Sequence, residues 1–290
     1  MIHSIENDFI KVKIKEFGAE LCSMKKINDT VEYLWQADKN YWNRHSPILF
    51  PIVGKLLDDE YIYNNKTYKM TQHGFARDQL FKLHSKKDAE IIFSLTESHE
   101  TLKIYPFKFE LLVSYRLVKK VLDIGYKVVN HSLNKMLFSI GAHPAFNWPL
   151  FKHEDKENYY LEFLDTKELE RLPLTPLGIS SNKEIILLVN NKLDLTDTLF
   201  KDDALVIENL DNKSIILNNT ENKRKIEVSF ENFPFLGIWS KPQGSPFLCI
   251  EPWCGIADGI EHSKNLEEKK GIIILDKNGV FQSNYQITIE

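Results

Sequence analysis

Apolar and polar residues alternate with a period of two along much of this chain. Every second residue of segment 109–117 is apolar, and the pattern resumes at 122–128 after Lys119 and Lys120. Because successive side chains of a strand point to opposite faces, this pattern predicts an antiparallel hairpin with one buried face. Segments 90–96, 225–230, 247–251 and 285–289 alternate in the same way. Segment 61–70 predicts a second hairpin with Asn64 and Asn65 at its turn, since asparagine tolerates a positive φ.

Helical patterns are scarce. Segment 39–45 predicts a short turn, and segment 263–270 is charged without an apolar stripe, which predicts a loop or a short solvated helix. The chain shows no internal repeat, low-complexity tract or linker. We therefore expect an all-β protein in which residues 1–290 form one domain, a large antiparallel β-sandwich with few short helices.

Charge and composition exclude several kinds of partner. With a net charge of −4 and scattered basic residues, the chain lacks the positive surface that nucleic-acid binding needs. Its apolar runs are too short for a membrane helix, and the acidic residues near the N-terminus do not suit a signal peptide. Three cysteines, Cys22, Cys249 and Cys254, leave an odd number. A secreted protein would more often have an even set, so we expect a cytoplasmic location. The spacing of Cys249 and Cys254 is a weak metal pattern, so we expect buried free thiols.

Three segments interrupt the alternation with a dense mixture of titratable residues, glycine, proline and aromatics. They are 71–77 (TQHGFAR), 140–148 (IGAHPAFNW) and 249–255 (CIEPWCG). Glycine allows close approach of a ligand, and aromatic rings offer flat apolar surfaces. Each titratable residue on its own could be structural: a turn histidine, a core histidine or a buried carboxylate. Their combination indicates a binding or catalytic site.

These segments resemble, in order and spacing, three elements of the aldose 1-epimerase (galactose mutarotase-like) superfamily. His73–Arg77 is similar to its HGFAR element, Gly141–Phe146 to its GaHPaF element, and Glu251–Gly255 followed by Asp258 to its EPWxGxxD element. The resemblance covers nearly the whole chain and is strongest to the LacX-like branch. It implies a galactose mutarotase-like β-supersandwich with a shallow carbohydrate cleft.

The resemblance also implies the chemistry. Glu251 corresponds to a general base that removes the C1 hydroxyl proton, and His143 to a general acid that protonates the ring oxygen. His73 corresponds to a histidine that binds and polarises the substrate. The sugar ring opens to the aldehyde, rotates and closes on the other face, with no metal and no cofactor. A carboxylate and an imidazolium would suffice at neutral pH, and burial would raise the pKa of Glu251.

Several residues are candidates for binding a sugar or sugar phosphate. Asp203 resembles the family's sugar-binding aspartate, although Asp202 makes the match ambiguous and a turn role is equally compatible. The aromatic candidates for stacking on a sugar ring are Trp239, Trp148 and Phe146, with Asn147 beside them; core packing is their alternative role. In a hexose-6-phosphate branch of the family, arginines at positions similar to Arg44 and Arg77 bind phosphate; both could instead pair with carboxylates such as Asp78 or Glu251.

Three other functions stay open at this stage. A non-catalytic carbohydrate sensor could use the same scaffold, since fold does not settle function. A glycoside hydrolase would pair Glu251 with Asp203 or Asp258, but would leave the histidines unused. A zinc hydrolase would use His73 and His143, but a third ligand is not evident. We expect a monomer or homodimer.

Overall fold

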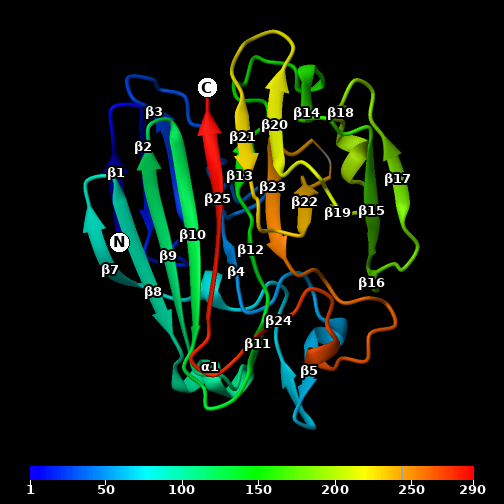
Figure 1. Cartoon of the computed structure of the whole chain (residues 1–290). Coiled ribbons are helices and arrows are strands. Elements are labelled where there is room, and N and C mark those ends of the chain that lie inside the picture. The colour runs from blue at the N-terminus through cyan, green and yellow to red at the C-terminus, as the bar shows by residue number, and fades with distance from the viewer. Residues whose placement is uncertain (243) are drawn as a thin grey trace.

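The computed structural model describes residues 1–242 and 244–290 and consists mainly of antiparallel strands (Figure 1). The C-terminal strand β25 joins the two halves of a nine-stranded sheet, lying between β21 and β10 (Figure 1). In spatial order this sheet contains β18 (Lys192–Asp194), β14 (Tyr159–Phe163), β20 (Ser214–Asn219), β21 (Ile226–Ser229), β25 (Val280–Ile289), β10 (Val121–Asn130), β9 (Phe109–Val118), β8 (Glu90–Thr96) and β7 (Lys82–Lys87).

The second nine-stranded sheet carries the residues that the sequence singled out. In spatial order it contains β16 (Gly178–Ile179), β15 (Glu168–Thr175), β19 (Leu205–Glu208), β22 (Phe235–Trp239), β23 (Phe247–Cys254), β12 (Ile140–Ala142) and β4 (Ile48–Leu49); β13 (Ala145–Asn147) also pairs with β23, and β17 (Glu184–Leu187) with β15. The expected all-β fold with large antiparallel sheets is thus confirmed.

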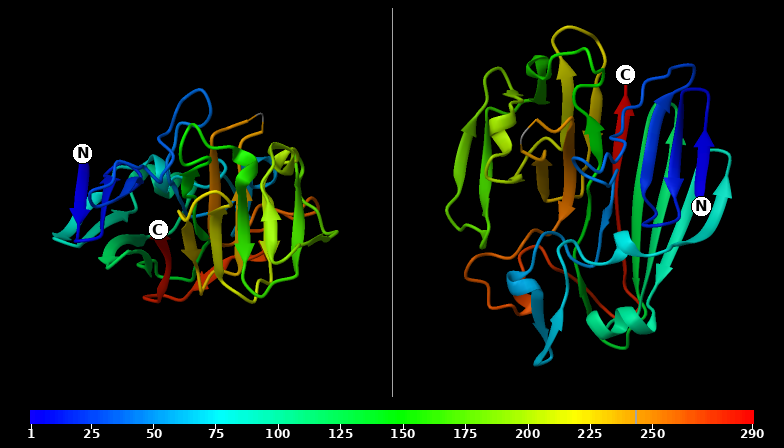
Figure 2. Two further views of the ribbon diagram at one scale, coloured as in Figure 1. Left: turned by 90° about the horizontal axis from the view of Figure 1, so that it is seen from above. Right: turned by 180° about the vertical axis from the view of Figure 1, so that it is seen from behind.

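Smaller elements surround the two sheets. The N-terminal strands lie across β7–β10, behind them in Figure 1 and in front of them in the right view of Figure 2. The small sheets are β1 (Ile2–Glu6), β2 (Ile10–Lys15) and β3 (Leu21–Lys26); β5 (Glu60–Tyr63) with β6 (Lys66–Lys69); and β11 (Met136–Phe138) with β24 (Ile273–Leu275). The helical elements are α1 (His99–Ile104) and the 3₁₀ turns η1 (Leu57–Asp59), η2 (Ala76–Asp78), η3 (Lys156–Asn158), η4 (Asp197–Phe200) and η5 (Leu266–Glu268).

Both predicted hairpins are present. Strands β9 and β10 pair in continuous register and meet at Val118 and Val121. Strands β5 and β6 meet at Asn64 and Asn65, whose φ angles of 49° and 58° explain the choice of asparagine. The predicted strand 247–251 extends to Cys254, because β23 is buried on both faces and its end does not alternate.

The position of helix α1 was not predicted. It is set by a local signal: the Ser98 hydroxyl accepts from the Thr101 amide, and the Thr101 hydroxyl accepts from the Ser98 amide. This reciprocal cap satisfies two amides that a helix start leaves unpaired. The charged segment 263–270 contains only η5, and 39–45 only a turn, as expected.

The main hydrophobic core draws on strands from both ends of the chain, from Ile5 to Ile289. One face of β9 supplies five core residues, from Phe109 to Leu117, each no more than 5% exposed. Burying side chains of this size stabilises the fold by roughly 1.5–3 kcal/mol each. The alternation seen in the sequence therefore records which face of each strand meets the core.

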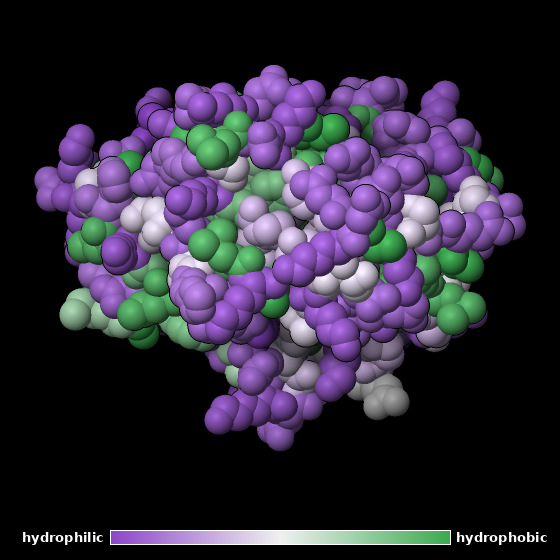
Figure 3. All heavy atoms as spheres, turned by 90° about the horizontal axis from the view of Figure 1, so that it is seen from below, coloured by the Kyte–Doolittle hydropathy of each residue, from purple (hydrophilic) through white to green (hydrophobic). Residues whose placement is uncertain are grey.

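The surface offers mostly polar side chains on the face shown in Figure 3, with apolar side chains in small separate groups. None of the helices in the described parts of the chain has the length and apolar character needed to cross a bilayer.

Candidate functional site

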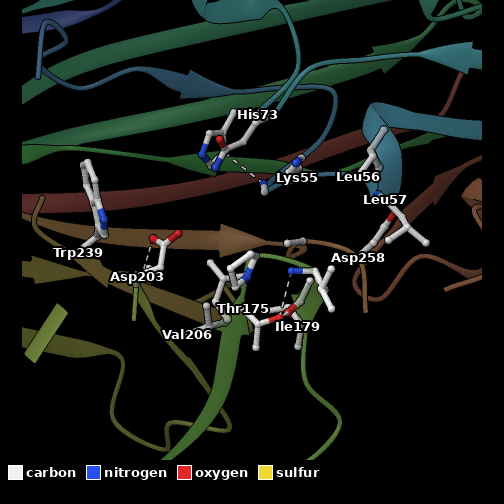
Figure 4. A pocket seen from close by; sticks show the side chains of 18 of the residues that line it. Lys55, Leu56, Leu57, His73, Thr175, Ile179, Asp203, Val206, Trp239 and Asp258 are labelled. Carbon is white, nitrogen blue, oxygen red and sulfur yellow. Dashed lines mark hydrogen bonds between the residues drawn. The ribbon is translucent and has the colours of Figure 1, made fainter. Parts of the chain in front are cut away.

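A cavity of about 730 Å³ lies over the second sheet. Strands β15, β16, β19, β22 and β23 and the loops 54–58, 72–77 and 256–260 supply most of its lining. The other lining residues are Trp42, His143, Pro176, Leu177, Asp203 and Ala204. In Figure 4, Trp239 and Asp203 lie at one side, His73 lies at the top, and Leu56, Leu57 and Asp258 lie at the other side. The volume is within the range of small-molecule sites, about 300–1,000 Å³.

Glu251 lies in the middle of β23 and is 1% exposed. It pairs across the sheet with Gly237 of β22. A Cβ atom at Gly237 would lie 2.5 Å from the ring of Trp253, so only glycine leaves room for that indole beside Glu251. A rigid central strand thus fixes the carboxylate at the cavity.

His143 follows β12 and brings its imidazole to the same carboxylate. Its Nε2 lies 3.2 Å from Glu251 Oε2. The ring stacks on Trp42, with centroids 4.8 Å apart, and meets Trp239 edge to face at 5.8 Å. Two aromatic rings therefore set the plane in which the imidazole faces Glu251.

His73 is the third titratable residue at this end of the cavity. It has a positive φ of 67°, and its ring centroid lies 5.6 Å from that of His143. Its amide donates to the Gly54 carbonyl at 2.9 Å, and the Gly54 amide donates to Nδ1 at 3.1 Å. Because Nδ1 accepts this bond, the neutral ring carries its proton on Nε2. The ring can donate that proton to a ligand oxygen.

Burial controls the charge of the acid–base pair. It raises the pKa of Glu251 well above the usual range, and the nearby charge of Asp203 raises it further. Burial and the charge of Arg77 lower the pKa of His143 to about 3. The raised pKa of Glu251 agrees with the expectation from the sequence. The lowered pKa of His143 does not agree with the expected imidazolium, because it favours a neutral ring at neutral pH. Both shifts favour the neutral forms of the two groups, since a charge in this dry site is costly.

Two buried atoms of this pair make no regular hydrogen bond. Among the described residues, His143 Nδ1 has no hydrogen-bond partner, and Glu251 Oε2 has only the contact with His143 Nε2 at 3.2 Å, which is not aligned as a hydrogen bond. An unpaired buried polar atom is unfavourable, and a catalytic or ligand-binding role is one reason for it to be kept. Burial, together with the neighbouring charge of His143, also lowers the pKa of His73 well below its usual value.

Asp203 lines the cavity, whereas Asp202 does not. Asp203 has a φ of 82°, and its Oδ1 accepts from the amide of Ala204 at 2.8 Å. The neighbouring Asp202 is exposed and pairs with Lys201. Asp203 therefore forms a turn that places its carboxylate at the cavity (Figure 4), and its binding of a sugar stays a prediction.

The two arginines differ in position. Arg77, in η2, lines the cavity; its guanidinium donates to the Gln72 carbonyl at 2.6 Å and lies 3.8 Å from the Asp78 carboxylate. Burial lowers the pKa of Arg77 to about 10. Arg44 donates to Asp78 at 2.9 Å and is not part of the lining. The expectation that both face the ligand is therefore wrong for Arg44, because Asp78 holds it outside.

The aromatic candidates also divide. Trp239 lines the cavity, as expected. Phe146 does not, because it lies on the opposite face of β13 from Ala145 and is 0% exposed in the main core. Asn147 does not either, since its amide donates to the Glu32 carbonyl at 2.7 Å. Trp148 is 1% exposed and lies under the Lys156 ammonium, 3.8 Å from its ring centre. These three residues are structural.

Asp258 has a structural role in the cavity wall. Its Oδ1 accepts from the fully buried Lys269 ammonium at 2.8 Å, and its Oδ2 accepts from the Leu57 amide at 3.0 Å. A carboxylate held in this way is not free to attack or protonate a glycosidic bond. The glycosidase alternative thereby loses its second carboxylate at this position.

A metal-capable group is present beside the pair. Ligand atoms of His143, Cys249 and Glu251 lie within 4.8 Å of one another, and all three residues are buried. The zinc alternative named His73 with His143, but Nδ1 of His73 is engaged by Gly54. Cys254 lies outside this group, and the described cysteines are free thiols.

Sequence reasoning missed a large part of the lining. Trp42, loop 55–58 and the hairpin end 174–179 line the cavity but were not among the predicted site residues, and neither was Gln72 of segment 71–77. The tryptophan among polar residues in 40–44 was a usable signal. The hairpin end carries no such signal, because its place follows from the bridge between Ile179 and Gly259.

Comparisons with known proteins agree with this arrangement. Residues 1–287 match the family described as Aldose 1-epimerase. The chain is 35% identical over 298 aligned positions to "Protein LacX, plasmid" of Lactococcus lactis subsp. lactis, covering 100% of this chain and 99% of that protein.

Solved structures give the same result. A galactose mutarotase related enzyme from Lactobacillus acidophilus is 40% identical with a TM-score of 0.96, covering 100% of this chain and 97% of that one. A galactose mutarotase-like protein from Lactobacillus casei is 33% identical with a TM-score of 0.92, covering 100% of both chains. The chain belongs to the aldose 1-epimerase family.

Proposed function

We propose that this protein is an aldose 1-epimerase that interconverts the α and β anomers of a hexose or a hexose 6-phosphate. The observation that carries the proposal is the pair of Glu251 and His143, 3.2 Å apart in the buried floor of a cavity. Mutarotation requires one proton to leave the C1 hydroxyl and another to reach the ring oxygen. A pair that shares one proton can accept the first and deliver the second.

The proposed reaction has these steps. Glu251, as the carboxylate, takes the proton from the C1 hydroxyl while His143, as the imidazolium, protonates the ring oxygen. The bond between C1 and the ring oxygen breaks, and C1 becomes an aldehyde. Rotation about C1–C2 turns the other carbonyl face to the ring hydroxyl, and the reverse proton transfers close the ring. The number of protons on the pair is restored.

The other residues bind and orient the sugar. His73 donates from Nε2 to a sugar oxygen, since Nδ1 accepts from Gly54. Asp203 accepts from sugar hydroxyls at the mouth of the site. Trp239 and Trp42 offer apolar ring surface beside His143. In this buried floor, each of these polar contacts with the sugar is stronger than it would be in water.

Anomer exchange measured by NMR saturation transfer tests the proposal. Glucose, galactose and their 6-phosphates are compared for the wild type, Glu251→Gln and His143→Asn. We expect exchange above the buffer rate with at least one sugar, and a loss of ~10²–10⁴-fold in each variant. Wild-type rates in a variant that remains folded would remove that residue from the mechanism.

A non-catalytic sensor predicts a different result. Binding of a sugar, detected by calorimetry, without any exchange above buffer would favour the sensor. The buried acid and base, Glu251 and His143, support catalysis, because a protein that only binds sugar needs no matched acid and base. We further expect one domain, a cytoplasmic location and a monomer or homodimer; the free buried thiols support a reducing compartment.

A further inference from the structure

Cys249 lies directly beside the proposed acid–base pair. It precedes Glu251 by two residues on β23, so both side chains point to the same face of the sheet. It pairs with Ala145 on one neighbouring strand and with Trp239 on the other, and it is 0% exposed. The thiol therefore lies in the floor, while Glu251 and His143 face the cavity.

The three side chains form a compact set of donor atoms. A carboxylate oxygen, an imidazole nitrogen and a sulfur lie within 4.8 Å of one another. Among the described residues, His143 Nδ1 is buried without a hydrogen-bond partner, and Glu251 Oε2 makes no hydrogen bond beyond its 3.2 Å contact with His143 Nε2. Buried donor atoms without a hydrogen bond indicate a ligand. The thiol of Cys249 is not needed for acid–base catalysis, so its place in this group indicates a ligand other than the sugar.

The identity of the donors selects the ligand. Cysteine, histidine and carboxylate together suit Zn²⁺ and ions that resemble it, whereas Mg²⁺ and Ca²⁺ prefer oxygen alone. Zinc–ligand bonds of about 2.0–2.3 Å place tetrahedral ligands about 3.5 Å apart, so the side chains need to close by about 1 Å. The fourth position faces the cavity, through which the ion enters.

We propose that His143, Cys249 and Glu251 form an inhibitory site for Zn²⁺ and related thiophilic divalent cations. On binding, the Cys249 thiol releases its proton to solvent and the sulfur coordinates as thiolate. The ion occupies the atoms that would exchange protons with the sugar, so ion and sugar exclude each other. The binding stands on the donor geometry alone; the inhibition rests on the proposed epimerase function.

Cobalt titration tests the binding without any assay of activity. Co²⁺ bound through sulfur gives a thiolate-to-cobalt charge-transfer band in the near ultraviolet. We expect this band in the full-length wild type and in Cys254→Ala, which removes another buried cysteine outside the group. We expect it to be absent from Cys249→Ala and Cys249→Ser, of which the serine variant closely keeps the shape of the side chain.

Zinc inhibition of anomer exchange tests the second half. We expect inhibition competitive with the sugar, and a zinc concentration for half inhibition at least ~10-fold higher in Cys249→Ser. No cobalt band in the wild type, or a band that survives in both Cys249 variants, would overturn the site. A Cys249-dependent band with unchanged exchange would overturn the inhibition. If no sugar exchanges at all, the proposed function fails, and the cobalt band alone decides the metal site.

Discussion

At the scale of single residues, the site depends on charge placed in a dry floor. Burial favours the neutral form of both residues: it raises the pKa of Glu251 and lowers the pKa of His143. The pair works while it holds one proton. It gains a second only near the lowered pKa of His143, and it loses the last one only above the ordinary range of a glutamate. Epimerase activity should therefore persist well below pH 6.5, where a free imidazole would already be charged.

Asp203 offers a way to shift this profile. Its charge raises the pKa of Glu251, second only to burial. We expect Asp203→Asn to lower that pKa and so move the basic limb of kcat/KM to lower pH, because the pair loses its proton sooner. The profile is measured by saturation transfer from about pH 4 to about pH 9. Asp202→Asn is the matched control, and a basic limb that moves equally in both variants would contradict the assignment.

Substitution of Arg77 tests whether the substrate carries a phosphate. It is the arginine that lines the cavity, and its buried Nε has no hydrogen-bond partner among the described residues. If a 6-phosphate binds here, Arg77→Ala should raise KM for the phosphorylated sugar by about 10–100-fold, the value of a lost charged hydrogen bond. KM for the free sugar should change little. Arg44→Ala is the control, and equal effects of both variants on both sugars would contradict phosphate recognition by Arg77.

At the scale of elements, backbone geometry places His73. The loop after β4 crosses Gly54, whose φ is +76°, and a Cβ there would lie 2.4 Å from the Ala257 amide nitrogen. Gly54→Ala should destabilise the fold by roughly 1–3 kcal/mol. It should also lower kcat, because the added methyl group would move the Gly54 loop away from Ala257 and disturb its hydrogen bonds with His73. Urea unfolding and anomer exchange measure the two effects. Gly244→Ala is the control: Gly244 has a similar φ of +79°, but a Cβ there would lie 3.7 Å from its nearest atom, so this variant measures the cost of the backbone angle alone. Equal losses of stability in the two variants would contradict the steric argument.

Strands and turns could be predicted from local pattern, and the wall of the site could not. The alternating pattern predicted the observed bounds of β8, and Asn64–Asn65 predicted the turn between β5 and β6. Both predictions succeeded because such features are determined by neighbouring residues in the sequence. The resemblance named His73, His143 and Glu251, whose motifs are continuous in sequence. Phe146 was misassigned because a motif does not say which face of β13 its residue occupies.

At the scale of the whole molecule, the cavity exists because distant segments meet over β22 and β23. Trp42, Gln72, the hairpin end 174–179 and loop 256–260 come from separate parts of the chain. Their meeting depends on long-range contacts: Ile179 donates to the Asp258 carbonyl at 2.9 Å, and Asp258 accepts from the Leu57 amide at 3.0 Å. No local pattern encodes such contacts, so this part of the site was beyond sequence reasoning.

Another long-range contact connects the N-terminal sheet to the site. Glu20, between β2 and β3, is 8% exposed. Its Oε1 accepts from the amides of His45 and Ser46 at 2.8 and 3.2 Å, and its Oε2 accepts from the Lys15 ammonium at 3.1 Å. Burial acts to raise its pKa, but the hydrogen bonds from His45 and the charge of Lys15 outweigh it and lower the pKa to about 2. The bonds also fix the segment that leads from Trp42 into β4.

This lowered pKa predicts how stability depends on pH. A carboxylate with a folded pKa of about 2 and an ordinary value of 4.5 stabilises the fold fully above pH 4.5 and loses this contribution as the pH falls toward 2. Glu20→Gln should therefore lower the free energy of unfolding by about 1–3 kcal/mol at neutral pH, and the gap to wild type should fall by more than half near pH 3. Urea unfolding at several pH values measures it. Glu6→Gln, which breaks an exposed pair with Lys11, should change little at any pH. A gap for Glu20→Gln that stays constant down to pH 3 would mean that shape, and not the charge of Glu20, holds the N-terminal sheet to the site.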